Sequence, residues 1–416
     1  MCSEFRAIDG AIDTSRDTAI DGAIDVAVVG GCGHVGLPLG IALAERGKTV
    51  ALYDINELSV KTVNGGEMPF LEDGAQRPLQ SGLDAGKLRA TIDPGVIGRA
   101  EYVVVVVGTP VDEHLSPDLQ AVPRALRQLG EHLRDGQLLI VRSTVYPGVT
   151  SLVERVVAEL GKDIDIAFCP ERIAEGRAMT ELFTLPQLVA ARTEDVRLRA
   201  AALFSVLTDK IVPMAPEEAE LAKLFTNTWR YIKFATANQF YMLANDAGLD
   251  FSRIRDALRL DYPRAADLPM SGFAAGPCLF KDTMQLSAFG DNNFPLGHAA
   301  MLVNEGLPLY LVSRMAEKYD LEKMTVGILG MAFKGESDDI RESLSYKLRR
   351  TLLVRAGQVL CTDPYVTGDV RLSPLDEVLS QADLLVIGAP HRAYADLQTD
   401  LPVVDIWDLR HQGVLV

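Results

Sequence analysis

Residues 26–36 read VAVVGGCGHVG, and this stretch decides the fold of the first half of the chain. The β-branched run at 26–30 predicts a strand that breaks into glycines. Gly31, Gly33 and Gly36 then have the GxGxxG spacing, which is a weak signal by itself because loops of that spacing occur by chance. The elements on either side therefore decide whether this is a ligand-binding loop.

The flanking elements favour a ligand-binding loop. Residues 37–46 predict a helix that Gly47 ends, and residues 49–53 predict a second strand that leads into Asp54. This is the order of a dinucleotide-binding βαβ unit, in which the glycines let the backbone approach the pyrophosphate and the helix N-terminus faces it. Asp54 would accept hydrogen bonds from the adenosine ribose and repel the extra phosphate of NADP. The sequence therefore predicts NAD as the cofactor.

Further strands are predicted downstream, at residues 102–107, 138–141 and 164–168, because each run is apolar on both faces, as a buried parallel sheet requires. Two of them lead into loops that carry hydroxyl side chains, one with Thr109 and the other with Thr144. Ligands of such sheets bind at the carboxyl ends of the strands.

A long helix is predicted from Pro216 to about Ala247, because about 30 residues pass without proline or glycine. Glu217, Glu218 and Glu220 load its first turn, where acidic residues favour a helix. Its apolar positions make it a candidate dimer core; they include Leu224, Phe225, Trp229, Phe234 and Tyr241.

The βαβ pattern restarts at Met324, with strands predicted at 326–329, 359–361, 384–387 and 403–404 and a helix at 343–356. The predicted fold class is therefore α/β, with two doubly wound Rossmann-like domains joined by a long central helix. The predicted parts are a flexible tail at 1–25, an NAD-binding Rossmann domain at 26–212, a central helical dimerisation domain with the nucleophile at 213–318, and a C-terminal Rossmann-like ligand-binding domain at 319–416.

Composition limits the possible partners. The 416 residues carry a formal net charge of -16, which argues against nucleic acid as the main partner. No run of 18 apolar residues occurs in the sequence, so no membrane span is expected. A phosphorylated ligand stays compatible, because helix N-termini and a few local cations suffice for one pyrophosphate.

The five cysteines are scattered and have no paired spacing, which predicts reduced thiols in the cytoplasm. Without a CxxC motif or a cluster of histidines, no metal site is expected. The heptapeptide AIDGAID occurs at 7–13 and again at 19–25, and this region lacks the basic and apolar parts of a secretory signal. We expect it to be an acidic tail.

The segment with the most chemical information is GFAAGPCLFKD, residues 272–282. A loop of small residues leads to Cys278, which on residue type alone is either buried filler or a nucleophile. Lys281 would favour its thiolate, and Asp282 is a candidate general base. Beside a nicotinamide, a thiol allows two successive oxidations: an alcohol becomes an aldehyde, the thiol adds to form a thiohemiacetal, and a second hydride loss gives a thioester that water hydrolyses to an acid.

Taken together, seven motifs in order make residues 26 to 410 resemble the UDP-glucose/GDP-mannose dehydrogenase family. They are the glycine loop, the strand-end loops GTP (108–110) and STVYPG (143–148), CPERIAEG (169–176), ELAK (220–223) followed by Asn227, Cys278 with Lys281-Asp282, and GMAFK (330–334) with DIRES (339–343). The resemblance implies that Cys278 is the covalent nucleophile.

The resemblance also implies the other roles. Lys223 and Asn227, at i and i+4 on one helix face, would hold the C6 oxygen or an oxyanion. Asp282 would act with a water as base, and Glu171 would assist proton transfer and the water step. Implied cofactor contacts are Gly31, Gly33, His34, Val35, Gly36, Asp54, Thr109, Thr144, Glu175, Lys281 and Arg341. Implied substrate contacts are Glu171, Arg172, Ile173, Ala174, Glu175, Lys223, Asn227, Arg264, Phe273, Gly276 and Lys334. Of Arg264, Lys334 and Arg341, some would act from across a subunit boundary.

The activity implied by the resemblance is an NAD-dependent, four-electron oxidation of the C6 hydroxyl of a nucleotide sugar to a carboxylate, in a homodimer or higher homo-oligomer. A UDP-hexose, with UDP-glucose first, is the expected substrate, because Leu-Phe-Lys-Asp after Cys278 is similar to the glucose and mannose branches. UDP-N-acetylmannosamine or UDP-N-acetylglucosamine is the alternative, and GDP-mannose a further one. Trp407 stands where the glucose branch usually has an arginine that contacts the substrate, and the residues at 304–308 also lean toward the N-acetyl branches.

Two other classes of function stay open on the residues alone. A two-electron β-hydroxyacid dehydrogenase shares the first domain and the long helix but needs no thiol, and it would form one NADH per acid instead of two. A non-catalytic NAD-binding protein is the other class. The joint presence of Cys278, Lys223, Asp282 and Glu171 argues against it.

Overall fold

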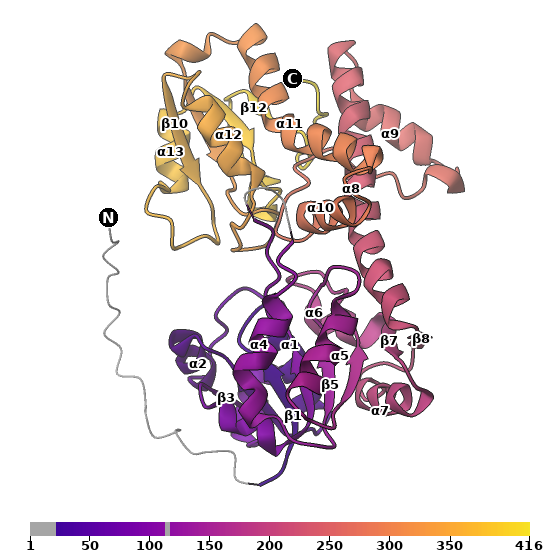
Figure 1. Cartoon of the computed structure of the whole chain (residues 1–416). Coiled ribbons are helices and arrows are strands. Elements are labelled where there is room, and N and C mark those ends of the chain that lie inside the picture. The colour runs from indigo at the N-terminus through magenta and orange to yellow at the C-terminus, as the bar shows by residue number, and fades with distance from the viewer. Residues whose placement is uncertain (1–21, 113–116) are drawn as a thin grey trace. The chain divides into compact units, whose positions relative to one another are not determined.

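The computed structural model describes residues 22–112 and 117–416 (Figure 1). Most of the N-terminal tail expected at 1–25 lies outside these residues. The last two residues of that expected tail belong to the first strand, β1 (Ile24–Val29). Apart from residues 110–118, which group with the second part, the chain divides into two compact units between Glu220 and Leu221.

The first unit is built on an eight-stranded sheet in the order β3-β2-β1-β4-β5-β6-β7-β8, parallel except between β6 and β7. After β1 its strands are β2 (Val50–Tyr53), β3 (Leu88–Thr91), β4 (Ala100–Val105), β5 (Leu138–Val141), β6 (Asp165–Phe168), β7 (Gln187–Ala191) and β8 (Ile211–Met214). Its helices are α1 (Gly36–Glu45), α2 (Glu57–Asn64), α3 (Gln76–Asp84), α4 (Ala121–Leu129), α5 (Val149–Glu159), α6 (Ala178–Thr184) and α7 (Glu194–Phe204), with 3-10 turns η2 (Pro94–Arg99) and η3 (Gly130–His132).

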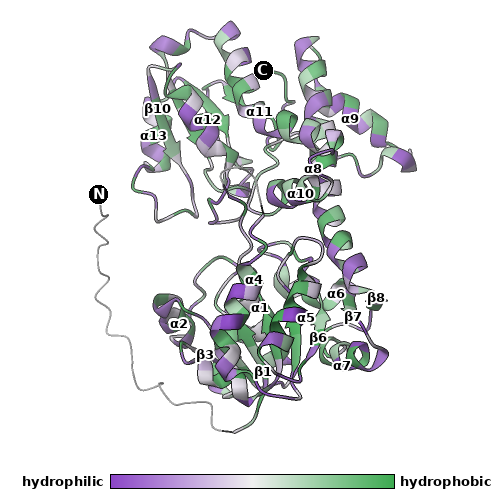
Figure 2. Cartoon of the chain, viewed as in Figure 1, coloured by the Kyte–Doolittle hydropathy of each residue, from purple (hydrophilic) through white to green (hydrophobic). Residues whose placement is uncertain are grey.

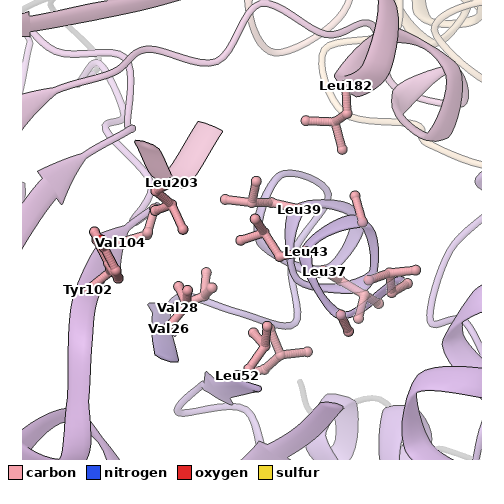
Figure 3. Packing of buried hydrophobic residues seen from close by; sticks show 14 of the residues in the cluster. Val26, Val28, Leu37, Leu39, Leu43, Leu52, Tyr102, Val104, Leu182 and Leu203 are labelled. Atoms are coloured by element: carbon pink, nitrogen blue, oxygen red, sulfur yellow. The ribbon is translucent and has the colours of Figure 1, made fainter. Parts of the chain in front are cut away.

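Both faces of this sheet are covered, which explains why its strands are apolar throughout. Along β1, Val26 and Val28 belong to one core cluster and Ala27 and Val29 to the other. In Figure 3, Leu39 of α1 faces the strands that form the first of these clusters. In Figure 2, β1 and β5 are coloured as hydrophobic, and purple residues lie on the helices around them. Strands β2 and β3 are added on one side of β1 and β4 to β6 on the other, so the loops after β1 and β4 diverge and open the crevice in which such sheets bind ligands.

The second unit combines helices with a four-stranded parallel sheet in the order β10-β9-β11-β12. Its helices are α8 (Pro216–Asp246), which crosses the boundary, α9 (Phe251–Arg259), α10 (Leu279–Phe289), α11 (Pro295–Lys318), α12 (Leu344–Leu352) and α13 (Leu375–Gln381), with turns η4 (Pro263–Ala265), η5 (Leu321–Lys323) and η6 (Arg392–Tyr394). Its strands are β9 (Thr325–Leu329), β10 (Gln358–Thr362), β11 (Leu384–Ile387) and β12 (Val403–Val404). The long helix and all four strands stand where the sequence predicts them, to within a residue.

Helix α12 is shorter than the predicted 343–356: it ends at Leu352, and its N-cap Ser343 accepts a hydrogen bond from the backbone of Ser345. The central helices and the C-terminal sheet also share one core. Tyr241 of α8 and Leu311 of α11 belong to the same buried cluster as Leu384 of β11. The predicted boundary at 318–319 is therefore not a gap in the packing.

Within the described ranges, no helix is long and apolar enough to cross a membrane. No group of three or more His, Cys, Asp or Glu side chains in the same ranges could hold a metal ion.

Candidate active site

The three glycines of the loop after β1 differ in what a side chain would meet. A Cβ on Gly31 would lie 2.7 Å from the backbone of Leu52, and one on Gly36 would lie 2.4 Å from the carbonyl oxygen of Gly30. A Cβ on Gly33 would meet only one atom, at 3.7 Å. Gly31 and Gly36 are thus required by the close contact of loop, strand and helix, whereas Gly33 leaves open backbone for a ligand. That open cradle at the N-terminus of α1 fits a pyrophosphate.

Asp54 lies beside this loop, at the end of β2. Its Oδ2 accepts a hydrogen bond from the backbone N–H of Cys32 at 3.0 Å, and its Oδ1 accepts one from Asn56 at 3.0 Å. The carboxylate is therefore fixed in orientation and only partly buried, as a group that binds a ribose requires. His34 stacks on Phe70 with ring centroids 3.9 Å apart, at the outer side of the glycine loop.

The two strand-end loops that the sequence singled out are joined to each other. The hydroxyl of Thr109 donates to the carbonyl oxygen of Thr144 at 2.5 Å. The hydroxyl of Ser143 donates to the carbonyl oxygen of Val107 at 2.8 Å. The loops after β4 and β5 are thus held together at the carboxyl edge of the sheet, next to the glycine loop in strand order.

Glu171, which follows β6, is held by a residue that the sequence reasoning missed. Arg142, only 1% exposed at the end of β5, pairs with Glu171 Oε2 and also donates to the carbonyl oxygen of Cys169 at 3.1 Å. Glu171 Oε1 accepts from the backbone N–H groups of Arg172 and Ile173, at 2.7 and 3.0 Å. Both carboxylate oxygens therefore organise the loop that follows. The available signal was an arginine placed directly after a fully apolar strand.

Glu220 has a different role from the one its position suggested. We expected it to favour the first turn of α8 as a helix-end charge, but its side chain is fully buried. Its carboxylate accepts hydrogen bonds from the backbone N–H groups of Gly148 and Thr150 and from the hydroxyl of Thr150, at 2.6 to 2.8 Å. It thereby binds the N-terminus of α5, because the first N–H groups of a helix have no partner within the helix.

The expected catalytic residues of the second unit lie on α8 and α10. Lys223 and Asn227 are both buried, at 7% and 5% exposure, so Lys223 is not a solvated surface charge. Asn227 Nδ2 donates to Asp282 Oδ2 at 2.6 Å. Among the described residues, Lys223 has no carboxylate within ion-pair distance. A buried ammonium of this kind is costly unless it serves to bind an anionic oxygen.

Cys278 is the N-cap residue of α10 and is exposed, whereas Cys32, Cys169 and Cys361 are buried. Burial raises the pKa of the Cys169 thiol to about 12, so that thiol is inert. Cys278 stands at the N-terminus of α10, the positive end of the helix dipole. Lys281, in the first turn, lies 3.5 Å from Asp282 Oδ1. Cys278 thus combines solvent access with a place at a helix N-terminus.

In the C-terminal sheet, β10 is added on one side of β9 and β11 on the other, so the loops after β9 and β11 open a second crevice. The loop after β9 carries Lys334, whose ammonium lies over the ring of Phe333. Asp363 holds this loop, because its Oδ2 accepts hydrogen bonds from the backbone N–H groups of Met331 and Ala332 at 2.6 and 3.0 Å. Asp363 also pairs with fully buried His391 at 3.0 Å.

Two arginines expected near ligands lie at more exposed positions. Arg341 is half-exposed and pairs with Asp339. Arg264 lies on the turn η4, where it donates to the hydroxyl of Tyr262 at 3.2 Å. The expectation that some of Arg264, Lys334 and Arg341 act across a subunit boundary stays a prediction.

The structure therefore groups the expected residues by unit. The first unit holds the glycine loop, Asp54, the Thr109 and Thr144 loops and residues 171–175. The second holds Lys223, Asn227, Cys278 and the Lys281-Asp282 pair, together with the loops of Phe273, Gly276, Lys334 and Arg341.

Comparison with known proteins covers both units. The NAD-binding domain of the UDP-glucose/GDP-mannose dehydrogenase family matches residues 24–208, its central domain residues 217–306, and its UDP-binding domain residues 327–410. UDP-N-acetyl-D-mannosamine dehydrogenase of Pyrococcus horikoshii is 31% identical over 88% of this chain and 89% of the relative.

Two solved structures share the fold over most of the chain. A UDP-glucose dehydrogenase from Pyrobaculum islandicum superposes with a TM-score of 0.85 at 29% identity, over 92% of this chain and 94% of the other. The UDP-D-ManNAc dehydrogenase of Pyrococcus horikoshii also gives 0.85, at 28% identity, over 92% and 95%. With an NAD-binding domain, a UDP-binding domain and the central domain between them, this chain belongs to the UDP-glucose/GDP-mannose dehydrogenase family and is an NAD-dependent oxidoreductase.

Proposed function

We propose that the protein oxidises the C6 hydroxyl of a UDP-N-acetylhexosamine of the N-acetylmannosamine type to a carboxylate, forming two NADH. The observation that carries the reaction type is the buried group of Lys223, Asn227 and Asp282 in the unit that exposes Cys278. A two-electron dehydrogenase has no need of the thiol.

In the proposed mechanism, NAD held by the glycine loop after β1 and by Asp54 would supply the hydride acceptor for both oxidations. Asp282, through a water, takes the proton of the C6 hydroxyl, and the ammonium of Lys223 and the amide of Asn227 stabilise negative charge on that oxygen. The thiolate of Cys278 then attacks the aldehyde carbon, and the resulting oxyanion takes a proton to give a thiohemiacetal. After the second oxidation, water cleaves the C–S bond of the thioester, which releases the acid and restores the thiol.

Glu171 was expected to move protons in the water step. Its carboxylate is instead occupied by Arg142 and by two backbone N–H groups, so we propose that it fixes the substrate loop 172–176.

The preference for an N-acetylated sugar replaces UDP-glucose, which the sequence placed first. It is supported by relatives named UDP-N-acetyl-D-mannosamine dehydrogenase at 28 to 31% identity, in Pyrococcus horikoshii and Escherichia coli. It is also supported by Trp407, whose indole N–H is already bonded to the carbonyl oxygen of Ile387 at 3.1 Å. By the family resemblance, the glucose branch usually has an arginine that contacts the substrate at this position, whereas the indole of Trp407 carries no charge.

The test is one coupled assay across UDP-N-acetylmannosamine, UDP-N-acetylglucosamine, UDP-glucose and GDP-mannose, with NADH and acid both quantified. We expect the highest kcat/KM with UDP-N-acetylmannosamine and two NADH per acid. A higher kcat/KM with UDP-glucose would restore the glucose assignment, and one NADH per product would overturn the four-electron mechanism.

We also propose that the active form is a homodimer assembled on α8. Leu224 and Tyr241 pack inside the unit, but Phe225, Trp229, Phe240 and Leu243 are 44 to 61% exposed. At about 100° per residue these four lie within an arc of about 60° on one face of the helix. Exposed apolar residues gathered on one face of a helix in this way, here in two groups with the exposed Thr236 between them, are typical of a protein–protein interface.

A further inference from the structure

The loop that leads to Cys278 contains two glycines in left-handed conformations, Gly272 with φ +151° and Gly276 with φ +97°. Each lies against an aromatic ring. A Cβ on Gly272 would lie 2.3 Å from the ring of Trp407, and one on Gly276 would lie 2.6 Å from the ring of Phe333. Both the backbone angle and the space therefore require glycine, and the two rings lie directly on the loop backbone.

Hydrogen bonds tie the same loop at both ends. The amide of buried Asn238 on α8 donates to the carbonyl oxygen of Gly272 at 3.0 Å and accepts from its N–H at 2.9 Å. The hydroxyl of Ser271 donates to the carbonyl oxygen of Ile406 at 2.6 Å, and the N–H of Gly276 donates to that of Glu342 at 3.4 Å. The loop is thus fixed to α8 and to two loops of the C-terminal sheet.

The first ring is itself held in place. The indole N–H of Trp407 donates to Ile387, the backbone N–H of Trp407 donates to Asp405 at 3.0 Å, and Phe273 meets the indole edge-on with centroids 6.1 Å apart. Phe273 is only 5% exposed, so the loop also inserts a side chain of its own beside the ring. Trp407 therefore acts as a fixed surface for the start of the loop.

The second ring belongs to a segment with ligand-binding chemistry. Phe333 precedes Lys334, lies in the loop after β9, and donates its backbone N–H to the carbonyl oxygen of Asp339 at 2.9 Å. A displacement of this segment would also displace Gly276, which lies two residues before Cys278, because close-packed protein interiors transmit displacements between neighbouring groups.

We propose that Trp407 and Phe333 are positioning residues that clamp the nucleophile loop at Gly272 and Gly276, and that the Phe333 contact makes the alignment of Cys278 depend on nucleotide bound at the Lys334 loop. The inference rests on the proposed function, since it assigns Cys278 the capture of an aldehyde. It assigns neither ring a contact with reacting atoms.

The first experiment follows the fate of the aldehyde. In wild type the thiolate captures the aldehyde before it can leave, so little aldehyde oxime forms with added hydroxylamine; the oxime is quantified separately from the hydroxamate that hydroxylamine forms from a thioester. In Trp407→Leu and Phe333→Leu the first oxidation should persist while capture slows, so trapped aldehyde should rise several-fold relative to acid. Trp407→Phe, which keeps a ring, should restore capture in large part. Phe251→Leu is the matched control, because it removes an aromatic ring from the core cluster against which Trp407 packs, but at the start of α9, outside the loop and the C-terminal sheet.

The second experiment is independent of turnover. It measures the rate of alkylation of Cys278 by iodoacetamide, by mass spectrometry of its peptide, with and without UDP. UDP should change this rate several-fold in wild type and in Phe251→Leu, and by much less in Phe333→Leu.

The outcomes separate the two claims. Alkylation of wild-type Cys278 that UDP leaves unchanged, or an equal response in Phe333→Leu, overturns the coupling. Aldehyde release by Trp407→Leu no greater than by Phe251→Leu overturns the clamp. One NADH per product in wild type, together with a UDP response that requires Phe333, would instead refute the proposed function and leave the coupling supported.

Discussion

Asn227 on α8 donates a hydrogen bond of 2.6 Å to Asp282 on α10, and both side chains are buried. This bond fixes one carboxylate oxygen of Asp282. The other, Oδ1, lies 3.5 Å from Lys281 and accepts no hydrogen bond from the described residues. An oriented carboxylate with one remaining acceptor position can hold a water, which is what the base of the proposed first step requires.

Asn227→Asp should therefore be strongly disruptive. It places a second carboxylate against Asp282, so the two carboxylates must share a proton. Activity at neutral pH should fall at least tenfold, and the free energy of unfolding should fall by about 3 kcal/mol. Thermal unfolding and a pH profile of kcat measure both effects. The exchanged pair, Asn227→Asp with Asp282→Asn, restores the hydrogen bond in reverse and should recover stability without recovering the rate. Full activity in the exchanged pair would contradict Asp282 as the base.

Cys278→Ser should stop the reaction after the first oxidation, because a serine hydroxyl is a far weaker nucleophile than a thiolate at neutral pH. Binding of NAD and nucleotide sugar should change little, and at most one NADH should form per bound sugar. Lys223→Ala should slow both oxidations, since its ammonium stabilises charge on oxygen in each. Rapid-quench analysis of products measures both. Steady formation of two NADH per acid by Cys278→Ser would refute the covalent mechanism.

The carboxylate of Asp54 should make the enzyme prefer NAD over NADP by roughly tenfold or more in kcat/KM, because it would repel the 2′-phosphate. Asp54→Asn keeps an oxygen that can accept from Cys32 and removes the charge, so the preference should shrink while stability changes little. The ratio of kcat/KM for the two cofactors is the measurement. Comparable efficiency of wild type with both cofactors would count against the assignment.

The exposed apolar face of α8 should be an interface between two copies of the chain. Trp229→Glu with Leu243→Glu introduces charges into that face and should shift the protein to a monomer at micromolar concentration, as measured by light scattering. Leu353→Glu is the control, because Leu353 is half-exposed and follows α12, well away from α8 in the chain. A wild-type monomer, or a dimer that survives both charges, would contradict this interface.

Acid should weaken the C-terminal sheet through Asp363. Burial alone would raise the pKa of this carboxyl, but hydrogen bonds from His391 and from backbone N–H groups lower it from 3.8 to about 2. Because the folded-state pKa is the lower one, the stabilisation is present above pH 3.8 and is lost as the pH falls toward 2; it amounts to about 2 kcal/mol. The free energy of unfolding, measured with urea between these pH values, should therefore fall more steeply with decreasing pH in wild type than in Asp363→Asn. Parallel curves for the two proteins would refute the prediction.

Several features of the fold could be predicted because they depend on local chemistry. The strand, glycine loop and helix at 26–46 and the long helix from Pro216 follow from periodicity and from glycine and proline placement. Strands β3, β7 and β8 were missed. β3 alternates buried and half-buried residues and β8 has two exposed residues among four, so neither shows the pattern of a fully buried strand, whereas β7 is buried over four of its five residues and was overlooked.

The sequence by itself determined the residue types of the chemistry: a thiol after a loop of small residues, an ammonium and an amide four residues apart on a helix, and an acid after the second strand. Only the tertiary structure decided which partner each of them has. Asn227 meets Asp282 across 55 positions of sequence, Arg142 meets Glu171 across 29, and Glu220 meets Thr150 across 70. Local propensity carries no information about such pairs. A buried charge or amide is tolerated only when its partner is close, and packing between distant elements supplies that partner.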